Sequence, residues 1–248
     1  MKGRENVGTF LICIDAGHGI NTAGKRCMKT LDPAETREWT LNNRIANHLQ
    51  NALKSYDCQT MRVDDVTGKN DVSLQNRVDN ANAANANVYI SIHHNAGING
   101  GSGGGICVFV NETASAKSVE LQTAVYESTV DKTGLRGNRA NPKPKATFYV
   151  LRKTAMPAIL GEFGFMDSST DVPIILTDGY AKSCADGIAE AIADVFGLKR
   201  ADGTPVRKWY ADAQKWAIDA GITDGTNPDK TATRAEVWAM LYRMNGGK

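Results

Sequence analysis

Short apolar runs that alternate with helical patterns are the feature that most constrains how this chain can fold. Six runs have the apolar, β-branched content of buried strands, at residues 10–15, 59–63, 88–92, 106–110, 147–152 and 158–163. Between them, apolar residues recur at helical spacing within residues 33–53, 74–86, 115–132 and 179–196. Strands that alternate with helices in this way predict an α/β domain with helices on both faces of the sheet.

The sequence changes character after Leu198. The polar stretch KRADGTPV is typical of a linker, and two short helical patterns follow it. We therefore expect three parts, namely a first domain at residues 1–198, a linker at 199–207 and a helical module at 208–248. About forty residues is the lower limit for an independent fold. We expect the module to pack against itself, against a second copy in a homo-oligomer, or against the first domain.

Composition excludes several classes of protein. The net charge is +2 and no basic stripe is interleaved with aromatic residues, so nucleic acid is not an expected partner. No apolar run reaches the ~18 residues that a membrane span needs. The five cysteines are widely spaced without a C-x-x-C pair, which argues against a disulfide framework and a cysteine-rich zinc site. The start, MKGRENVGTF, lacks the apolar core of a signal peptide and predicts synthesis in the cytoplasm.

Glu38 places a carboxylate on the apolar face of the first predicted helix. That helix is expected to begin at Pro33, with Asp32 as its N-cap and Glu35 completing a capping box. A carboxylate on a buried face needs a partner. A metal ion would serve, and Asn42, one turn further on, could brace the carboxylate. The alternative is a partly exposed glutamate in the first turn, where the helix dipole favours it, with Glu35 as the competing ligand.

Histidine and carboxylate side chains also lie where predicted strands end. His18 follows the first strand within DAGHG, and Asp15 could accept a hydrogen bond from its second ring N–H and fix the tautomer. His93 and His94 follow the third strand, where strand alternation points them to opposite faces. Glu162 lies near the end of the last strand. Taken alone, each of these residues is most simply explained as a hydrogen-bonded turn residue or as part of an ion pair at a strand end.

Taken together, these residues match the chemistry of a hydrolytic metal centre. Ligands gather at the carboxyl ends of strands in open α/β sheets. Two histidines and a carboxylate around an open position are typical of a catalytic zinc site. Zinc lowers the pKa of its bound water to about 7, and a further glutamate can then act as general base.

Four segments resemble, in order, the motifs of the zinc-dependent N-acetylmuramoyl-L-alanine amidases of bacterial autolysins and phage endolysins: IDAGHG, REWTLNNRIANHL, SIHHNA and ILGEFGF. The resemblance implies a mostly parallel sheet flanked by helices. It also implies one zinc ion per chain, with His18, Glu38 and His93 as ligands and Glu162 as the catalytic base. The family register Ser-x-His-x-Asn-Ala selects His93 and leaves the second histidine at the variable position.

Two segments depart from the family pattern. The stretch INTAGKRCMKTLDP is longer and more basic than the usual glycine-rich loop, and MDSSTD replaces the usual Asn after EFGF. We expect both segments to line the cleft, where they would change substrate preference and leave the chemistry intact.

The tail sequence WAIDAGITDGTNPDKTATRAE resembles one S-layer-homology repeat, a module that anchors proteins to secondary polymers of Gram-positive cell walls. The resemblance implies that Arg234, together with Thr233 and Glu236 of the TRAE signature, contacts such a polymer. The planar fork of arginine pairs well with anionic groups. A helical hairpin used for packing or self-association is the alternative.

The family resemblance implies a peptidoglycan hydrolase that cleaves the amide bond between N-acetylmuramic acid and L-alanine at the bacterial cell wall. A zinc carboxypeptidase-like peptidase would use the same kinds of metal ligand and is one alternative. A non-catalytic wall-binding protein is another. A wall substrate without a signal peptide favours an endolysin that is released through a membrane lesion.

Overall fold

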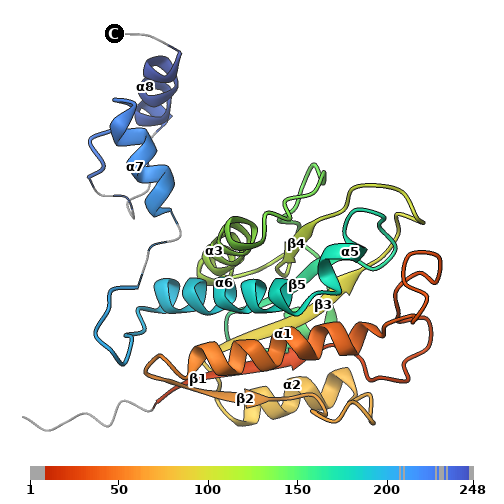
Figure 1. Cartoon of the computed structure of the whole chain (residues 1–248). Helices are drawn as coiled ribbons and strands as arrows, with labels where there is room; N and C mark the ends of the chain where they lie inside the picture. The colour runs from red at the N-terminus through yellow and green to blue at the C-terminus, as the bar shows by residue number, and fades with distance from the viewer. Residues whose placement is uncertain are drawn as a thin grey trace, which may run out of the picture. The chain divides into compact units, whose positions relative to one another are not determined.

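The computed structural model describes residues 9–206, 208, 210–226, 228, 232 and 234–245. The chain forms two compact units, Met1–Val206 and Arg207–Lys248. The first unit contains the sheet and six helices, and the second contains two helices (Figure 1). No helix in the described part of the chain combines the length and apolar character that a membrane span requires.

The sheet of the first unit has five strands in the order β2-β1-β3-β5-β4. Their bounds are β1 Phe10–Ala16, β2 Cys58–Arg62, β3 Val88–Asn95, β4 Ile106–Phe109 and β5 Ala158–Phe165. All neighbouring pairs are parallel except β4 with β5, which is antiparallel. The mostly parallel α/β sheet is confirmed. Its parallel strands bring the ends of β1, β3 and β5 to one edge.

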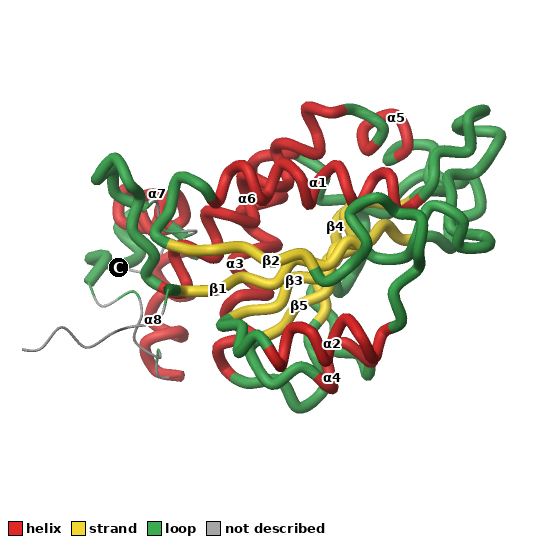
Figure 2. Tube along the Cα trace, turned by 90° about the horizontal axis from the view of Figure 1, so that it is seen from below, coloured by secondary structure: helices red, strands yellow, loops and turns green. Residues whose placement is uncertain are grey.

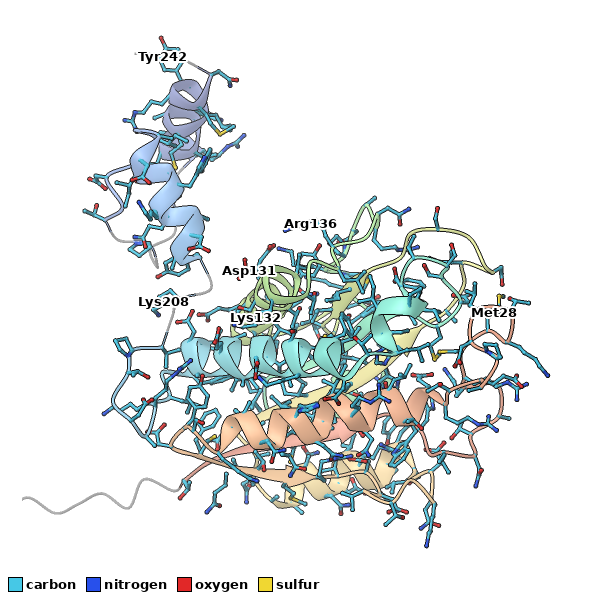
Figure 3. All side chains as sticks on the ribbon, viewed as in Figure 1. Met28, Asp131, Lys132, Arg136, Lys208 and Tyr242 are labelled. Carbon is cyan, nitrogen blue, oxygen red and sulfur yellow. The ribbon has the colours of Figure 1, made fainter. Side chains whose placement is uncertain are left out.

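Helices cover both faces of this sheet (Figure 2). Their bounds are α1 Glu38–Leu53, α2 Leu74–Ala83, α3 Ala116–Thr133, α4 Tyr149–Lys153, α5 Val172–Ile175 and α6 Asp178–Phe196. Helices α1, α3 and α6 pack together on one face, and α2 and α4 lie on the other. Side chains fill the layer between the helices and the strands (Figure 3).

Helix α1 anchors the site to the core. Leu41, Ile45, Leu49 and Leu53 recur at helical spacing and are at most 1% exposed. They form the stripe that packs on the sheet and on α6. Burying an aliphatic side chain of this size stabilises a fold by roughly 1.5–3 kcal/mol. Glu38, the first residue of α1, is therefore presented by a helix that is well packed on the core.

The predicted start of α1 is wrong by five residues. The Asp32 carboxylate accepts hydrogen bonds from the backbone N–H groups of Ala34 (3.2 Å) and Thr36 (2.7 Å), which closes a local turn. Glu35 adopts φ +48°, outside the helical region. Because Asp32 caps this turn and Glu35 is not in a helical conformation, no helix starts at Pro33, and α1 begins at Glu38.

The run at residues 147–152, which the sequence predicts as a strand, forms part of a helix in the structure. Residues 149–153 form the short helix α4, which packs against α2 and β5. Val150 and Leu151 are 4% and 6% exposed, so their apolar character is used in helix packing. The antiparallel strand β4 takes the place beside β5 that this segment would need.

The predicted linker begins with residues that belong to the first unit. The Asp57 N–H donates to the Lys199 carbonyl (3.0 Å), and the Ala201 N–H donates to the Ser55 carbonyl (2.9 Å). The Arg200 guanidinium lies over the Tyr56 ring. The boundary between the compact units falls at Val206, beyond these contacts.

The second unit contains α7 (Ala211–Asp219) and α8 (Arg234–Met244). Neither helix buries a residue, while Ile222 between them is 6% exposed. Large aromatic side chains are exposed on both helices, namely Trp216, Trp238 and Tyr242 at 58%, 61% and 62%. Tyr242 projects away from α8 (Figure 3). Thr233, predicted to contact wall polymer, lies outside the described residues.

Candidate metal centre

Three side chains from distant parts of the sequence meet at the carboxyl edge of the sheet. His18 follows β1, Glu38 begins α1 and His93 lies near the end of β3. One ligand atom from each lies within 4.8 Å of the others. Glu38 Oε1 is 3.0 Å from His93 Nδ1 and 3.3 Å from His18 Nε2. The structure thus brings together the three residues predicted as metal ligands, and Glu35, their competitor, instead pairs with Arg26.

The backbone between β1 and the site has an unusual shape. His18 adopts φ +67°, a left-handed conformation that costs free energy for a residue with a side chain. A Cβ atom on Gly17 would overlap the imidazole ring of His93. Gly17 therefore allows His93 to lie directly against the backbone that presents His18.

Glu38 is ionised despite its burial. Its side chain is 1% exposed, and burial alone raises the pKa of this carboxyl. Hydrogen bonding and charge interaction with His18 and His93 outweigh burial and hold the pKa well below its usual range. For His93, burial lowers the pKa, but Glu38 and then Glu162 raise it above the ordinary value.

The cluster fits a divalent metal by geometry and by two buried atoms that make no hydrogen bond. Tetrahedral zinc with bonds of about 2.0–2.2 Å requires ligand atoms roughly 3.3 Å apart, close to the distances from Glu38 Oε1. Among the described residues, His18 Nε2 and Glu38 Oε2 are buried without a hydrogen bond. Each has only an ion-pair contact, Nε2 with Glu38 Oε1 at 3.3 Å and Oε2 with Lys25 Nζ at 3.6 Å. Buried polar atoms normally make hydrogen bonds, and a bound cation would satisfy both.

Glu162 lies beside this cluster because of strand register. It pairs with His93 across the parallel strands β3 and β5. Burial raises the pKa of Glu162 to about 7, with Glu38 adding to the rise and His93 and Lys25 opposing it. Its Oε2 atom is buried without a hydrogen-bond partner among the residues described. A carboxyl group that titrates near neutral pH can both accept and return a proton.

Asp15 has different partners from those predicted. Its carboxylate accepts hydrogen bonds from Arg77 Nη1, from the Tyr89 hydroxyl (2.8 Å) and from the Ser91 hydroxyl (2.8 Å). Burial raises the pKa of Asp15, but the Arg77 guanidinium leads the interactions that lower it overall. Asp15 lies on the face of the sheet that α2 covers, and it holds the end of β1 through Arg77 and two residues of β3.

Arg77 links α2 to the end of β1 and to the turn that follows it. Its side chain is 1% exposed and donates to Asp15, to the Ala16 carbonyl (2.9 Å), to the His18 carbonyl (3.1 Å) and to Asp71 (3.1 Å). The sequence places Arg77 beside the apolar Val78 of α2, and this position was the only signal that Arg77 is buried. Asp71 is six residues away in the chain, but Asp15, Ala16 and His18 are about sixty residues away, and spacing could not relate them to Arg77.

Asn42 supports the site through partners other than Glu38. Its Nδ2 donates to the Gly17 carbonyl (3.1 Å), and its Oδ1 lies 2.8 Å from His94 Nδ1. His94 is 3% exposed, and burial lowers its pKa to about 3, so its ring is neutral. The two adjacent histidines therefore separate as alternation predicts, one toward the cluster and one against α1.

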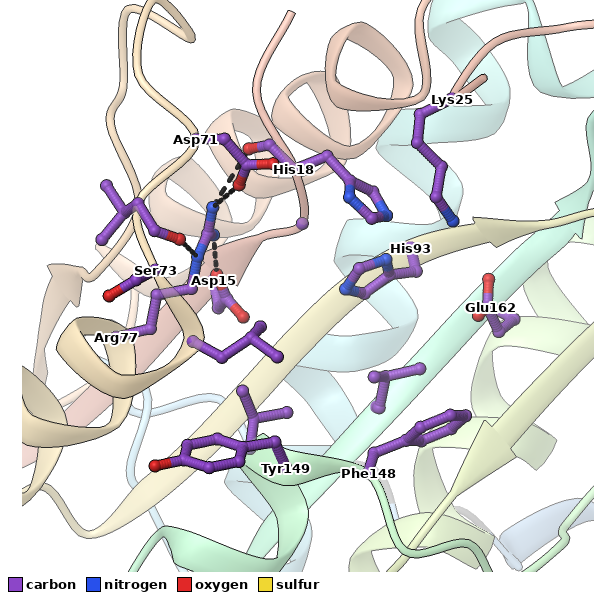
Figure 4. A pocket seen from close by; sticks show the side chains of 15 residues that line it. Asp15, His18, Lys25, Asp71, Ser73, Arg77, His93, Phe148, Tyr149 and Glu162 are labelled. Atoms are coloured by element: carbon purple, nitrogen blue, oxygen red, sulfur yellow. Dashed lines mark hydrogen bonds and ion pairs between the residues drawn. The ribbon is translucent and has the colours of Figure 1, made fainter. Parts of the chain in front are cut away.

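The cluster opens into a cleft of about 530 Å³ (Figure 4). Leu74, Phe148 and Tyr149 form an apolar wall opposite the histidines. Lys25, from the long basic loop that departs from the family pattern, reaches over the cleft toward Glu162 (Figure 4). The cleft can hold an extended substrate with apolar and polar parts. The MDSSTD segment, which was also expected to line it, contributes none of the lining residues described.

Fold and site together place the first unit among α/β domains that carry a cluster able to ligate a divalent metal at the carboxyl edge of the sheet. The sequence pattern of the N-acetylmuramoyl-L-alanine amidase family matches residues 12–194, and the chain belongs to this family.

Individual proteins agree with this assignment. The N-acetylmuramoyl-L-alanine amidase CwlM of Bacillus licheniformis is 30% identical over 191 residues, which cover 76% of this chain and 70% of that protein. The sporulation-specific N-acetylmuramoyl-L-alanine amidase of Bacillus subtilis is 29% identical over 214 residues, or 84% and 77% of the two chains. The crystal structure of an N-acetylmuramoyl-L-alanine amidase from Clostridium difficile 630 has a TM-score of 0.68 and 30% identity, covering 76% of this chain and 97% of that one.

Proposed function

We propose that this chain hydrolyses peptidoglycan with one Zn²⁺ held by His18, Glu38 and His93. Membership of the amidase family makes it an N-acetylmuramoyl-L-alanine amidase, which cuts the amide between N-acetylmuramic acid and L-alanine. The observation that carries the metal assignment is the convergence of three ligand atoms within 4.8 Å, two of the residues having a buried polar atom without a hydrogen bond among the described residues. Zinc bound there would supply a Lewis acid that activates water and polarises a carbonyl.

Glu162 is the proton carrier in this proposal. Water adds to the amide carbonyl carbon while Glu162 accepts one of its protons. The C–N bond then breaks as Glu162 returns that proton to the leaving nitrogen, giving a carboxylic acid that ionises and a free amine. Position and burial support this role, because Glu162 lies one strand from His93 and shares its cleft.

The Glu162→Gln variant tests this role. It should bind one zinc per chain, as measured by metal analysis after dialysis, and yet release almost no free amino groups from purified cell walls. A general base contributes about 10²–10⁴-fold to rate, so the residual activity should be correspondingly low. Full activity in this variant would refute the assignment of Glu162.

Mass spectrometry of digested peptidoglycan distinguishes the amidase from a carboxypeptidase-like enzyme. An amidase creates a new amino terminus at the alanine of the stem peptide, whereas a carboxypeptidase releases a terminal amino acid. Treatment with a chelator should abolish the first product, and added zinc should restore it. Metal analysis that finds no zinc would favour a wall-binding protein without this catalysis.

We also propose that residues 208–248 form a separate module that binds an anionic secondary polymer of the cell wall. The Arg234 guanidinium lies over the exposed ring of Trp238, and a cation beside an aromatic face suits an anionic glycan. Arg234→Ala should reduce sedimentation with intact walls but not with walls stripped of secondary polymer. Lys215→Ala, an exposed residue paired with Asp219 in the same unit, is the control. Unchanged sedimentation of Arg234→Ala, with dimers detected by light scattering, would favour self-association.

A further inference from the structure

Lys25 lies in a loop whose backbone is fixed to the metal cluster. Its carbonyl accepts a hydrogen bond from the Glu38 N–H (3.1 Å). The next residues pair across the loop, with a β-bridge between Arg26 and Arg37 and a bond from the Cys27 N–H to the Thr36 carbonyl (2.9 Å). Lys25 is therefore positioned by the same segment that presents the carboxylate ligand.

The Lys25 ammonium points into the reacting space. Its Nζ atom is 3.6 Å from Glu38 Oε2, and the side chain is 43% exposed and lines the cleft. Figure 4 shows it above His93 and Glu162, on the side opposite the apolar wall. An ammonium group carries three donors. Among the described residues, Nζ has an ion pair with Glu38 that is longer than a hydrogen bond. Its N–H donors are therefore available to a bound molecule.

Lys25 and Arg77 are the permanent cations that line this cleft. Arg77 is 1% exposed, and its guanidinium is already bonded to carboxylates and carbonyl groups of the protein. Among the described residues that line the cleft, Lys25 is thus the cation that a substrate can reach beside the metal cluster.

We infer that Lys25 is a catalytic residue of the amidase, whose ammonium donates a hydrogen bond to the carbonyl oxygen of the scissile amide as negative charge develops there. The inference rests on the proposed function. When water adds to the carbonyl carbon, the C=O double bond becomes a C–O single bond and the oxygen takes the electron pair. After the C–N bond breaks, the same oxygen belongs to the lactyl carboxylate of N-acetylmuramic acid, which Lys25 can still pair with. Removing one donor of this kind typically lowers kcat by about 10²–10³-fold.

The test compares zinc-loaded full-length wild type, Lys25→Met, Lys25→Arg and the control Lys29→Met. Lys29 is in the same loop, is 75% exposed and pairs only loosely with Glu35 (3.9 Å). With a soluble N-acetylmuramoyl peptide, Lys25→Met should lower kcat by about 10²–10³-fold while KM changes little. Lys25→Arg should recover part of the rate, and Lys29→Met should match wild type.

Two measurements separate catalysis from a structural role. Competition with a chromogenic chelator should give the same zinc affinity for wild type and Lys25→Met, and inhibition by N-acetylmuramic acid should weaken by about tenfold in the variant. A kcat within threefold of wild type would overturn the inference. So would a loss of zinc affinity in parallel with kcat, because Lys25 would then act by holding Glu38. An inactive zinc-loaded wild type would instead refute the proposed function itself.

Discussion

Replacing Arg77 by methionine should destabilise the fold and loosen the metal centre together. Methionine keeps much of the apolar volume of the side chain but removes the guanidinium. The Asp15 carboxylate, which is 1% exposed, would then keep only the hydroxyl donors of Tyr89 and Ser91. The carbonyl of His18 would also lose its bond to Arg77, so the turn that presents the first ligand would no longer be held.

The size of the effect follows from burial. Both partners of the Arg77–Asp15 pair are at most 2% exposed. Breaking a buried ion pair by removing one partner costs about 3–5 kcal/mol, because the other charge is left without compensation. A domain of this size is stable by about 5–15 kcal/mol, so a large fraction would be lost. The expected fall in Tm is roughly 6–20 °C.

Urea and thermal unfolding at pH 7, followed by circular dichroism, measure this loss. The double variant Asp15→Asn/Arg77→Met should regain much of it, since neither position of the pair then carries a buried charge. Lys182→Met removes a short pair with Asp186 whose lysine is 62% exposed, and it should cost less than about 1 kcal/mol. Arg77 lowers the pKa of Asp15 below 3.8, so the pair's contribution is present above that pH and is lost as Asp15 protonates below it. A cost below about 1 kcal/mol for Arg77→Met at pH 7 would contradict this reasoning.

Three further predictions concern the cluster itself. Gly17→Ala should weaken zinc binding at least tenfold in a chelator competition assay, because the new Cβ displaces the ring of His93. His93→Ala should abolish zinc binding, whereas His94→Ala should largely spare it; reversed results would show that the ligand assignment on β3 is wrong. Burial raises the pKa of Glu162 from 4.5 to about 7 in the zinc-free protein, so the stability held below pH 4.5 is lost as the pH rises through 7. Glu162→Gln should therefore stabilise the zinc-free protein by roughly 3 kcal/mol at pH 8 relative to wild type, with little difference at pH 4, and equal denaturation midpoints at pH 8 would count against a buried carboxylate.

The sequence predicted the sheet well because its buried strands are continuous apolar runs. Five of the six expected strands are present, and the apolar stripe of α1 marks a helix that is firmly packed. The failures have local causes. The side chain of Asp32 caps a turn in place of a helix, and the run at 147–152 uses its valine and leucine to pack a helix on β5. Capping patterns and apolar content do not distinguish these outcomes.

The sequence predicted which side chains lie together where strand ends meet, but not the specific contacts that these side chains make. His18, His93 and Glu162 follow or end strands whose carboxyl ends share an edge, so topology alone brings them together. The partners of Asp15 and Asn42 were wrong because each depends on side chains up to 76 residues away. No spacing rule relates such positions, and only the register of β1, β3 and α1 determines them.

The centre combines two unfavourable features within one small volume. His18 has a left-handed backbone, and Glu162 has its pKa raised toward neutrality by burial. The first costs backbone free energy, and the second destabilises the folded protein at high pH. In the proposed function the same features present a metal ligand and a proton carrier. The structure offsets these costs just behind the site, where Arg77 bonds the end of β1 to α2 and to the buried Asp15. The residues that stabilise the strand ends therefore lie directly behind the residues of the cluster. At the same zinc concentration, metal binding should stabilise Arg77→Met by less free energy than it stabilises the wild type, because a weakened site has a higher Kd for zinc.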